Sequence, residues 1–233
     1  MATRIGRGRA VITVGLLVGV VAATSGSAGA SAASQKAQAK KHLLVLSDMP
    51  KAWKTEKGNS SSGGNSKFPG ASQLASCIGV SPSLISSNPP EADSPYFENK
   101  GGSLEVQDSV SVFPSVKNAK AEYAAIANAK TPTCMATLMN GPFKAQIVAA
   151  AGKGATIGTI TAAAIDPSNY GPHTTGFTLS VPISVQGASI TAQLTSVYFI
   201  KGALGQQIDF NAYGPPFTAA STQHLTSVAL GRL

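Results

Sequence analysis

Residues that could perform catalysis or hold a metal are few in this chain of 233 residues. Its three histidines, His42, His173 and His224, show neither the H-x-x-x-H nor the H-E-x-x-H spacing of zinc sites. The G-x-S-x-G elbow of α/β-hydrolases is also missing. A triad assembled from distant residues, such as a serine with His173 and Asp166, stays open, because triads are defined by geometry. The sequence predicts no metal, no cofactor and no enzyme.

Paired carboxylates are a second way in which such a chain could do chemistry, since glycoside hydrolysis needs two of them in one cleft. The candidates are Asp48, Glu91, Asp93, Glu98, Glu105, Asp108, Asp166 and Asp209. Only Asp209 has nearby aromatic residues of the kind found at sugar sites, namely Phe210 and Tyr213. The alternative to a binding protein is therefore a cell-envelope hydrolase with a site near Asp209 and Tyr213.

Polar residues that alternate with apolar ones near the C-terminal end are the candidates for ligand binding. They are Gln193, Thr195, Gln207, Asp209 and Asn211. Hydrogen-bonding groups on a rigid sheet can orient a ligand. A sheet face that is simply exposed to solvent would show the same pattern. Val197 and Phe199 are expected to share this face, which indicates that helices or a ligand cover it.

Three predicted strands and a helix position these candidates. Apolar residues take every second position of 177–185. The pattern resumes at Ile190, Ala192, Leu194 and Tyr198, and again at Leu204, Ile208 and Phe210, and the short glycine-bearing breaks between these runs are typical of hairpins. Pro182 cannot donate to a ladder, so its strand is predicted at an edge or a bulge. After Tyr213, apolar residues three to four apart predict a closing helix from Phe217.

Shorter elements precede this meander and complete the predicted fold. The pattern predicts helices at 37–46, 69–79, 116–128, 133–139 and 143–151, strands at 52–56, 104–112 and 156–165, and an irregular connection at 81–95. Asp108 falls on the inner face of its predicted strand. Because a buried carboxylate must be paired or lie at a rim, Asp108 is expected to be either a strand-edge residue or a site residue. The fold class is α+β, an antiparallel sheet with helices packed on it.

The two cysteines, Cys77 and Cys134, are 57 residues apart in a chain that we expect to be exported. An even count in such a chain predicts one structural disulfide. The sequence has no C-x-x-C, and no histidine lies near either cysteine, which argues against a metal or redox pair.

The first 32 residues predict a Sec-type signal peptide, and hence a secreted protein. Arg4, Arg7 and Arg9 precede an uncharged run over 10–23 and small residues with A-x-A sites up to Ala32. That run is too short for a membrane span. We expect a basic linker and the start of the first helix at 33–42, and a single domain at 43–233.

The charge of the chain is mildly basic once this leader is set aside. Removal of its three arginines lowers the formal net charge from +8 to +5. Lysines and arginines interleaved with aromatic residues along one element are missing, so no nucleic-acid partner is predicted.

Four short motifs resemble a known family. They are the run 43–50 followed by Trp53, Cys77-Ile78-Gly79, the strand 109–113 followed by an alanine-rich helix and Cys134, and Phe199-Ile200-Lys201-Gly202. Together they resemble the extracellular sensor domains of actinobacterial PknH-type receptor kinases and their exported or lipoprotein relatives, from about Leu43 to Leu233.

The resemblance implies an antiparallel sheet with helices packed on it, a cleft for an unidentified ligand, and no catalysis. It thus predicts a secreted, non-enzymatic ligand-binding or sensor-like domain of the actinobacterial cell envelope. Its partner would be a small ligand or a cell-envelope component, and signalling would pass through a protein partner. The kinase members are expected to hold two disulfides, whereas this chain has cysteines for one, and no ligand residue is carried over from the family.

Overall fold

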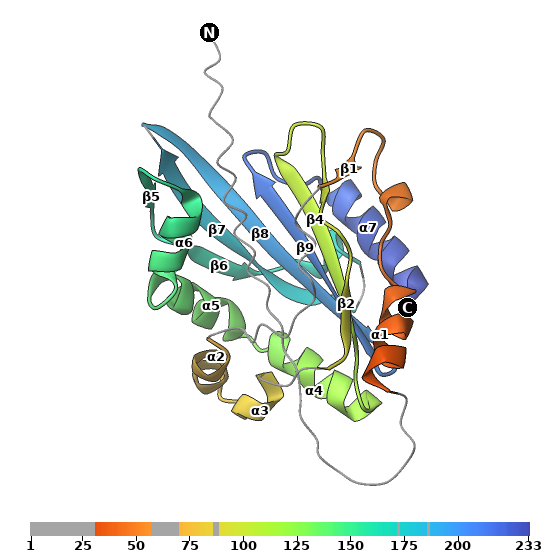
Figure 1. Ribbon diagram of the computed structural model, residues 1–233. Helices are drawn as coiled ribbons and strands as arrows, with labels where there is room; N and C mark the ends of the chain where they lie inside the picture. Colours follow the sequence, from red (N-terminus) through yellow and green to blue (C-terminus); the bar gives the residue numbers. More distant parts are fainter. Residues whose placement is uncertain (1–30, 57–69, 86–88, 172, 186) are drawn as a thin grey trace.

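The computed structural model describes residues 31–56, 70–85, 89–171, 173–185 and 187–233, which form one antiparallel sheet with helices on both faces (Figure 1). Within these residues the sheet has nine strands in the order β1-β3-β4-β9-β8-β7-β5, with β2 beside β4 and β6 beside β7. The strands are β1 (Lys54–Thr55), β2 (Glu91–Asp93), β3 (Phe97–Glu98), β4 (Leu104–Val112), β5 (Ala155–Ile157), β6 (Thr161–Ala164), β7 (Thr175–Val185), β8 (Ala188–Lys201) and β9 (Leu204–Tyr213). The predicted α+β class is confirmed. Residues 1–30 of the predicted signal peptide lie outside the described residues.

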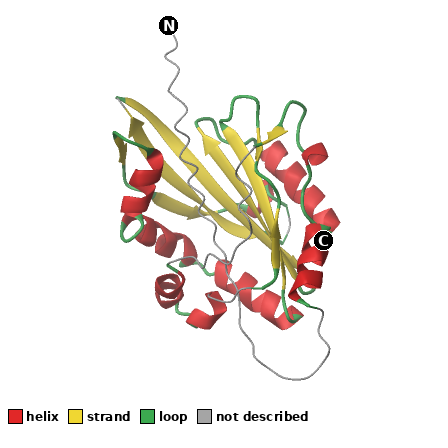
Figure 2. Cartoon of the chain, in the orientation of Figure 1, coloured by secondary structure: helices red, strands yellow, loops and turns green. Residues whose placement is uncertain are grey.

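The helices are α1 (Ala32–Lys40), α2 (Ala71–Ile78), α3 (Pro82–Ile85), α4 (Val116–Ile126), α5 (Thr131–Asn140), α6 (Lys144–Ala151) and α7 (Ala219–Arg232). One face of the sheet carries α2, α5 and α6, with α4 at its lower end, and the other face carries α7, as Figures 1 and 2 show. We call these the cleft face and the α7 face. In the described ranges every helix is too short or too polar to cross a bilayer.

The C-terminal meander of β7, β8 and β9 is confirmed, with register pairs such as Leu179 with Leu194 and Ile208 with Val197. Its first strand is buried as predicted: Phe177, Leu179, Val181 and Ile183 are at most 7% exposed, whereas the intervening Thr178, Ser180 and Ser184 are more exposed. Burial of such large side chains contributes roughly 1.5–3 kcal/mol each.

Strand β8 contributes to two separate cores because both of its faces are covered. Leu194 packs on the cleft face with β7 and with the helices α2, α5 and α6. Val197 and Phe199 pack on the α7 face with Ile208 and Leu225. The sheet is therefore the middle layer of three over part of its width, which explains the unbroken buried run from Val197 to Phe199.

The disulfide between Cys77 and Cys134 is present and joins α2 to α5, as predicted. Both helices pack on the cleft face of β7 and β8 through a shared core that includes Leu74 and Met135. Helices of 8 and 10 residues are not stable alone, so the crosslink and this core hold them in place.

Pro182 was predicted at an edge or a bulge, and the edge is wrong, because β7 has neighbours on both sides. β8 pairs with it along its whole length, while β5 and β6 pair with its two halves on the other side. The ladder is interrupted where Pro182 lies: its carbonyl accepts from the Gly158 N–H at 2.9 Å, in the gap between β5 and β6. The missing N–H of proline therefore falls in a break of the sheet instead of at its edge.

Asp108 is not at a strand edge either, since β4 lies between β9 on one side and β2 and β3 on the other. It is 1% exposed and lies on the α7 face. Its carboxylate accepts from the Leu44 N–H at 3.2 Å and from Gln206 Nε2 at 2.7 Å. Burial raises the pKa of Asp108 to about 6, and the hydrogen bonds from Ser94, Gln206 and Leu44 oppose that shift. Asp108 thus fixes the segment after α1 to the sheet.

Three other segments differ from prediction. The first helix begins at Ala32 instead of near Ala37, and it packs on β2 and β4. The strand predicted over 156–165 is split into β5 and β6. The connection at 81–95, predicted to be irregular, contains α3 and β2, and β3 follows directly.

Candidate functional site

A cleft opens on the cleft face of the sheet, over β7, β8 and β9. It is narrow: the empty space of about 330 Å³ includes the open solvent at its mouth, and the enclosed part has room for about one water molecule. Its lining is Tyr96, Phe177, Leu179, Leu194, Ser196, Asp209 and Asn211. One end of the cleft is therefore apolar, from β7 and β8, and the other end carries a hydroxyl, a carboxyl and an amide from β8 and β9.

Strand alternation brings these groups together. Cross-strand partners project from the same face, and the register pairs Ser196 with Asp209 and Leu194 with Asn211. Ile208 and Phe210, which alternate with Asp209 and Asn211 along β9, project into the core on the α7 face. That core holds β9 in place and so fixes the positions of Asp209 and Asn211 in the cleft.

Asp209 is held by hydrogen bonds within the sheet. Its Oδ1 accepts from the Ser196 hydroxyl at 2.6 Å, and its two oxygens accept from Gln207 Nε2 at 3.0 and 3.1 Å. Burial raises the pKa of Asp209 to about 6, these hydrogen bonds oppose the rise, and the charge of Asp93 adds to it. The carboxyl is therefore positioned, and it is mostly ionised at neutral pH.

Two more carboxyls from β2 lie on the same face, across β4. The register pairs Asp93 with Ser109 and Glu91 with Ser111. The serine hydroxyls donate to these carboxyls, at 2.7 Å for Asp93 and 3.1 Å for Glu91. Burial raises the pKa of Glu91 to about 9, with further contributions from the charge of Asp93 and from a hydrogen bond to it. Glu91 thus keeps its proton at neutral pH.

A fourth carboxyl, Glu122, reaches this face from α4. It is 3% exposed, and its carboxyl lies beside the buried Tyr198 hydroxyl, which has no other partner among the described residues. Burial, followed by the charge of Glu91, raises its pKa well above the usual range, and the neighbouring Tyr198 hydroxyl opposes the rise. Burial and the charge of Glu122 likewise raise the pKa of Tyr198. We call Glu91, Asp93, Glu122 and Asp209 the acidic cluster.

The acidic cluster is a set of carboxyls held in part by serine hydroxyls. Within the described ranges, no group of three or more His, Cys, Asp or Glu side chains could hold a metal ion. The serine hydroxyls nearest to it, Ser109, Ser111 and Ser196, donate to carboxyls, and no histidine lines the cleft. The arrangement therefore offers fixed hydrogen-bond acceptors beside an apolar surface.

The five predicted ligand-binding residues lie on both faces of the sheet, so the expectation that they share one face is wrong. Gln207, Asp209 and Asn211 project from the cleft face, and the last two line the cleft. Gln193 and Thr195 pair with Ala212 and Phe210 and so project from the α7 face. On that face the hydroxyls of Thr195 and Thr178 form a hydrogen bond at 2.8 Å.

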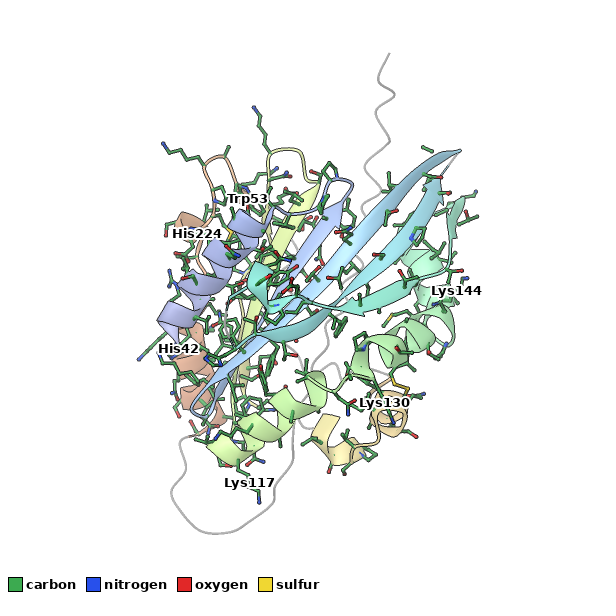
Figure 3. The ribbon with its side chains drawn as sticks, turned by 180° about the vertical axis from the view of Figure 1, so that it is seen from behind. His42, Trp53, Lys117, Lys130, Lys144 and His224 are labelled. Atoms are coloured by element: carbon green, nitrogen blue, oxygen red, sulfur yellow. A yellow bond between two sulfur atoms is a disulfide. The ribbon has the colours of Figure 1, made fainter. Side chains whose placement is uncertain are left out.

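The residues of the alternative hydrolase site are on the same face but are not joined. Tyr213 is four positions from Asp209, with Asn211 between them, and its hydroxyl donates to Glu105 Oε2 at 3.4 Å. The histidines lie elsewhere: His42 contacts the carbonyl of Arg232, His173 is in an exposed loop, and His224 is exposed on α7 (Figure 3). Asp166 caps a short turn by accepting from the Ser168 N–H at 2.9 Å.

The sequence did not identify the acidic cluster as a unit. Glu91, Ala92 and Asp93 alternate as a strand would, yet four prolines between 82 and 95 indicated irregular structure. Glu122 was an ordinary member of an amphipathic helix. The period-two pattern at 91–93 was the one signal that could have placed β2 beside β4.

Comparison with known proteins shows a distant structural resemblance. No known family matches the chain, and no curated protein matches its sequence. The crystal structure of the extracellular domain of PknH from Mycobacterium tuberculosis is similar over 84% of this chain and 95% of that chain, with 11% sequence identity and a TM-score of 0.41. The resemblance is therefore distant, and it does not show what this chain binds.

Proposed function

We propose that this protein is a secreted, non-enzymatic ligand-binding or sensor-like domain of the cell envelope, whose ligand lies in the cleft over β8 and β9. The cleft is the observation that carries the proposal: it places an apolar surface and a few fixed polar groups side by side on rigid strands. Binding sites are built in this way, because the apolar part supplies affinity and the polar part fixes orientation.

A fragment screen by two-dimensional NMR of the full chain tests this function. We expect fragments to shift the amide signals around Ser196, Asp209 and Asn211. Asn211→Ala should weaken these fragments, whereas Gln193→Ala, which removes an amide from the α7 face, should leave them unchanged. Fragments that bind elsewhere or nowhere, with both variants folded, would refute the proposed site.

The same preparation tests the hydrolase alternative. The chain is incubated with chromogenic esters, glycosides and peptides, and we expect no turnover above that of the buffer. Turnover that Asp209→Asn abolishes while the fold is retained would overturn the non-enzymatic proposal.

A further inference from the structure

The exposed charges of this chain are nearly all positive. All ten of its Asp and Glu residues lie within the described part of the chain, and there Asp166 alone is exposed, whereas the others are buried or half-buried. Ten lysines of the same part are exposed. The surface is therefore more basic than the net charge of the sequence indicates, because that count includes carboxyls that the fold withdraws from the surface.

Three segments that are far apart in the sequence bring exposed lysines to one end of the sheet. Ala39 of α1 shares a small core with Val112 and Leu204. The Phe113 N–H, shortly before α4, donates to the Ala203 carbonyl in the turn between β8 and β9 at 2.8 Å. The lysines of these segments are Lys40 and Lys41 at the end of α1, Lys117 and Lys120 in the first turns of α4, and Lys201 at the end of β8. We call this region the lysine end.

Carboxylates do not offset the charge of the lysine end. The ranges 31–47, 112–121 and 199–207, which form it, contain no Asp or Glu. Glu122 follows on α4, but it is 3% exposed, and burial raises its pKa well above the usual range, so that it keeps its proton at neutral pH. Glu91, which pairs with Ser111, also keeps its proton, because burial raises its pKa to about 9.

Two features of the lysine end favour a lipid surface as its partner. Val116, which is 45% exposed, lies one turn before Lys120 on α4 and so shares its side of the helix. An apolar side chain among lysines is typical of surfaces that rest on a bilayer. The predicted signal peptide joins α1 at this end, where Ser31 caps the helix, so this end faces the membrane during export. Figure 1 shows α1, the turn between β8 and β9 and the start of α4 at the lower end of the molecule, and Figure 3 shows Lys117 pointing away from it.

We propose that the lysine end docks this protein on an anionic lipid surface, with its five lysines near the headgroups and Val116 at the boundary of the acyl chains. Each lysine near such a surface strengthens binding by about fivefold. A lysine acts on phosphate as a point charge, so the five side chains need no fixed geometry. The docking is independent of the cleft and goes beyond the proposed function, since it concerns where the domain is held and not what it binds there.

Sedimentation with vesicles tests the docking. The chain, as cells export it, is mixed with vesicles of phosphatidylcholine alone or of phosphatidylcholine with anionic phosphatidylglycerol. We expect binding to the anionic vesicles to be at least about tenfold tighter. Most of this binding should be lost between about 0.1 M and 1 M salt, because the Debye length falls from about 10 Å to about 3 Å. Equal binding to both kinds of vesicle, or binding that salt does not weaken, would overturn the proposal.

Matched double variants assign the binding to the lysine end. Lys117→Gln with Lys120→Gln removes two charges from α4 and keeps good helix formers, so it should weaken binding to anionic vesicles about 25-fold. Lys51→Gln with Lys100→Gln removes the same charge near β1 and the start of β4, at the other end of the sheet, and should weaken it less than about threefold. Circular dichroism checks that both variants are folded. Equal losses in the two variants would mean that net charge alone attracts the protein, and the docking at this end would be wrong.

A soluble polyanion is the other partner that such charge attracts, and polyphosphate is its probe. Val116→Ser separates the two partners, because only a bilayer offers an apolar boundary. We expect this change to weaken binding to anionic vesicles about two- to fivefold and to leave binding to polyphosphate unchanged. If Val116→Ser binds vesicles as the original protein does, the lipid docking fails, and polyphosphate binding that depends on Lys117 and Lys120 would then assign this end to a polymer.

Discussion

Glu91→Gln should stabilise this protein, and the gain should depend on pH. A glutamine has the shape of the protonated acid: its amide oxygen can accept from Ser111, and its amide N–H can donate to Asp93 as the carboxyl proton does. The change therefore keeps the local hydrogen bonds and removes only the ability to titrate.

The magnitude follows from the difference between the two states. In the unfolded chain the Glu91 carboxyl ionises near its ordinary pKa of 4.5, whereas in the folded protein the pKa is about 9. Between these values the folded state binds more protons, so this group makes the free energy of unfolding fall by about 1.4 kcal/mol for each pH unit. At pH 7 the accumulated loss is up to about 3 kcal/mol, and glutamine avoids it.

Urea unfolding followed by circular dichroism at pH 4 and pH 7 measures the effect. We expect Glu91→Gln to match the original protein at pH 4 and to exceed it by up to about 3 kcal/mol at pH 7. Asp166→Asn is the control of opposite sign, because the Ser168 hydroxyl and N–H lower the pKa of this exposed carboxyl, and it should give no gain at pH 7.

Two results would refute this reasoning. A gain of the same size at pH 4 and pH 7 would mean that glutamine packs better for reasons unrelated to ionisation. A loss of stability at pH 7 would mean that the folded protein needs the ionised form of Glu91.

Two further predictions concern the scaffold. Replacement of Cys77 and Cys134 by serine should lower the free energy of unfolding by about 2–5 kcal/mol, because a loop of 57 residues is then no longer closed in the unfolded chain. Thiol counting on the original protein, unfolded without reductant, should find no free thiol. Free thiols, or an unchanged free energy of unfolding in the serine variant, would contradict this prediction. Gly176→Ala should lower the free energy of unfolding by about 3 kcal/mol or more, because a Cβ there, at φ +150°, would lie 1.9 Å from the Ser196 carbonyl oxygen. Gly231→Ala on α7, where a Cβ meets nothing within 4 Å, should raise the free energy of unfolding by about 0.5–1 kcal/mol in the same urea assay. Similar effects of the two changes would argue against this packing of β7 on β8.

Local patterns were sufficient where an element depends on its own residues. The period-two runs of β4, β7, β8 and β9 predicted these strands, and the stripe after Phe217 predicted α7. Cys77 and Cys134 predicted the disulfide because the chain offers no other pairing. The strands and the helix are determined by a few neighbouring residues, and the disulfide is determined because only one pair of cysteines exists.

The face on which each side chain lies was decided by strand pairing. The sequence suggested that Thr195 and Asp209 share a face, but the register pairs Thr195 with Phe210 and Ser196 with Asp209. A shift of one residue in register moves every side chain to the opposite face. The hairpin that sets this register has a two-residue loop, with Gly202 at φ +63° between Lys201 and Leu204.

The acidic cluster depended on tertiary structure for the same reason. Glu91 and Asp209 are 118 positions apart in the sequence and meet on one face only because β4 pairs with β2 on one side and with β9 on the other. Glu122 is added by the packing of α4 on the sheet. The sequence by itself determined the strands, the closing helix and the disulfide, whereas the cleft and its charge arose from long-range pairing, which no local pattern encodes.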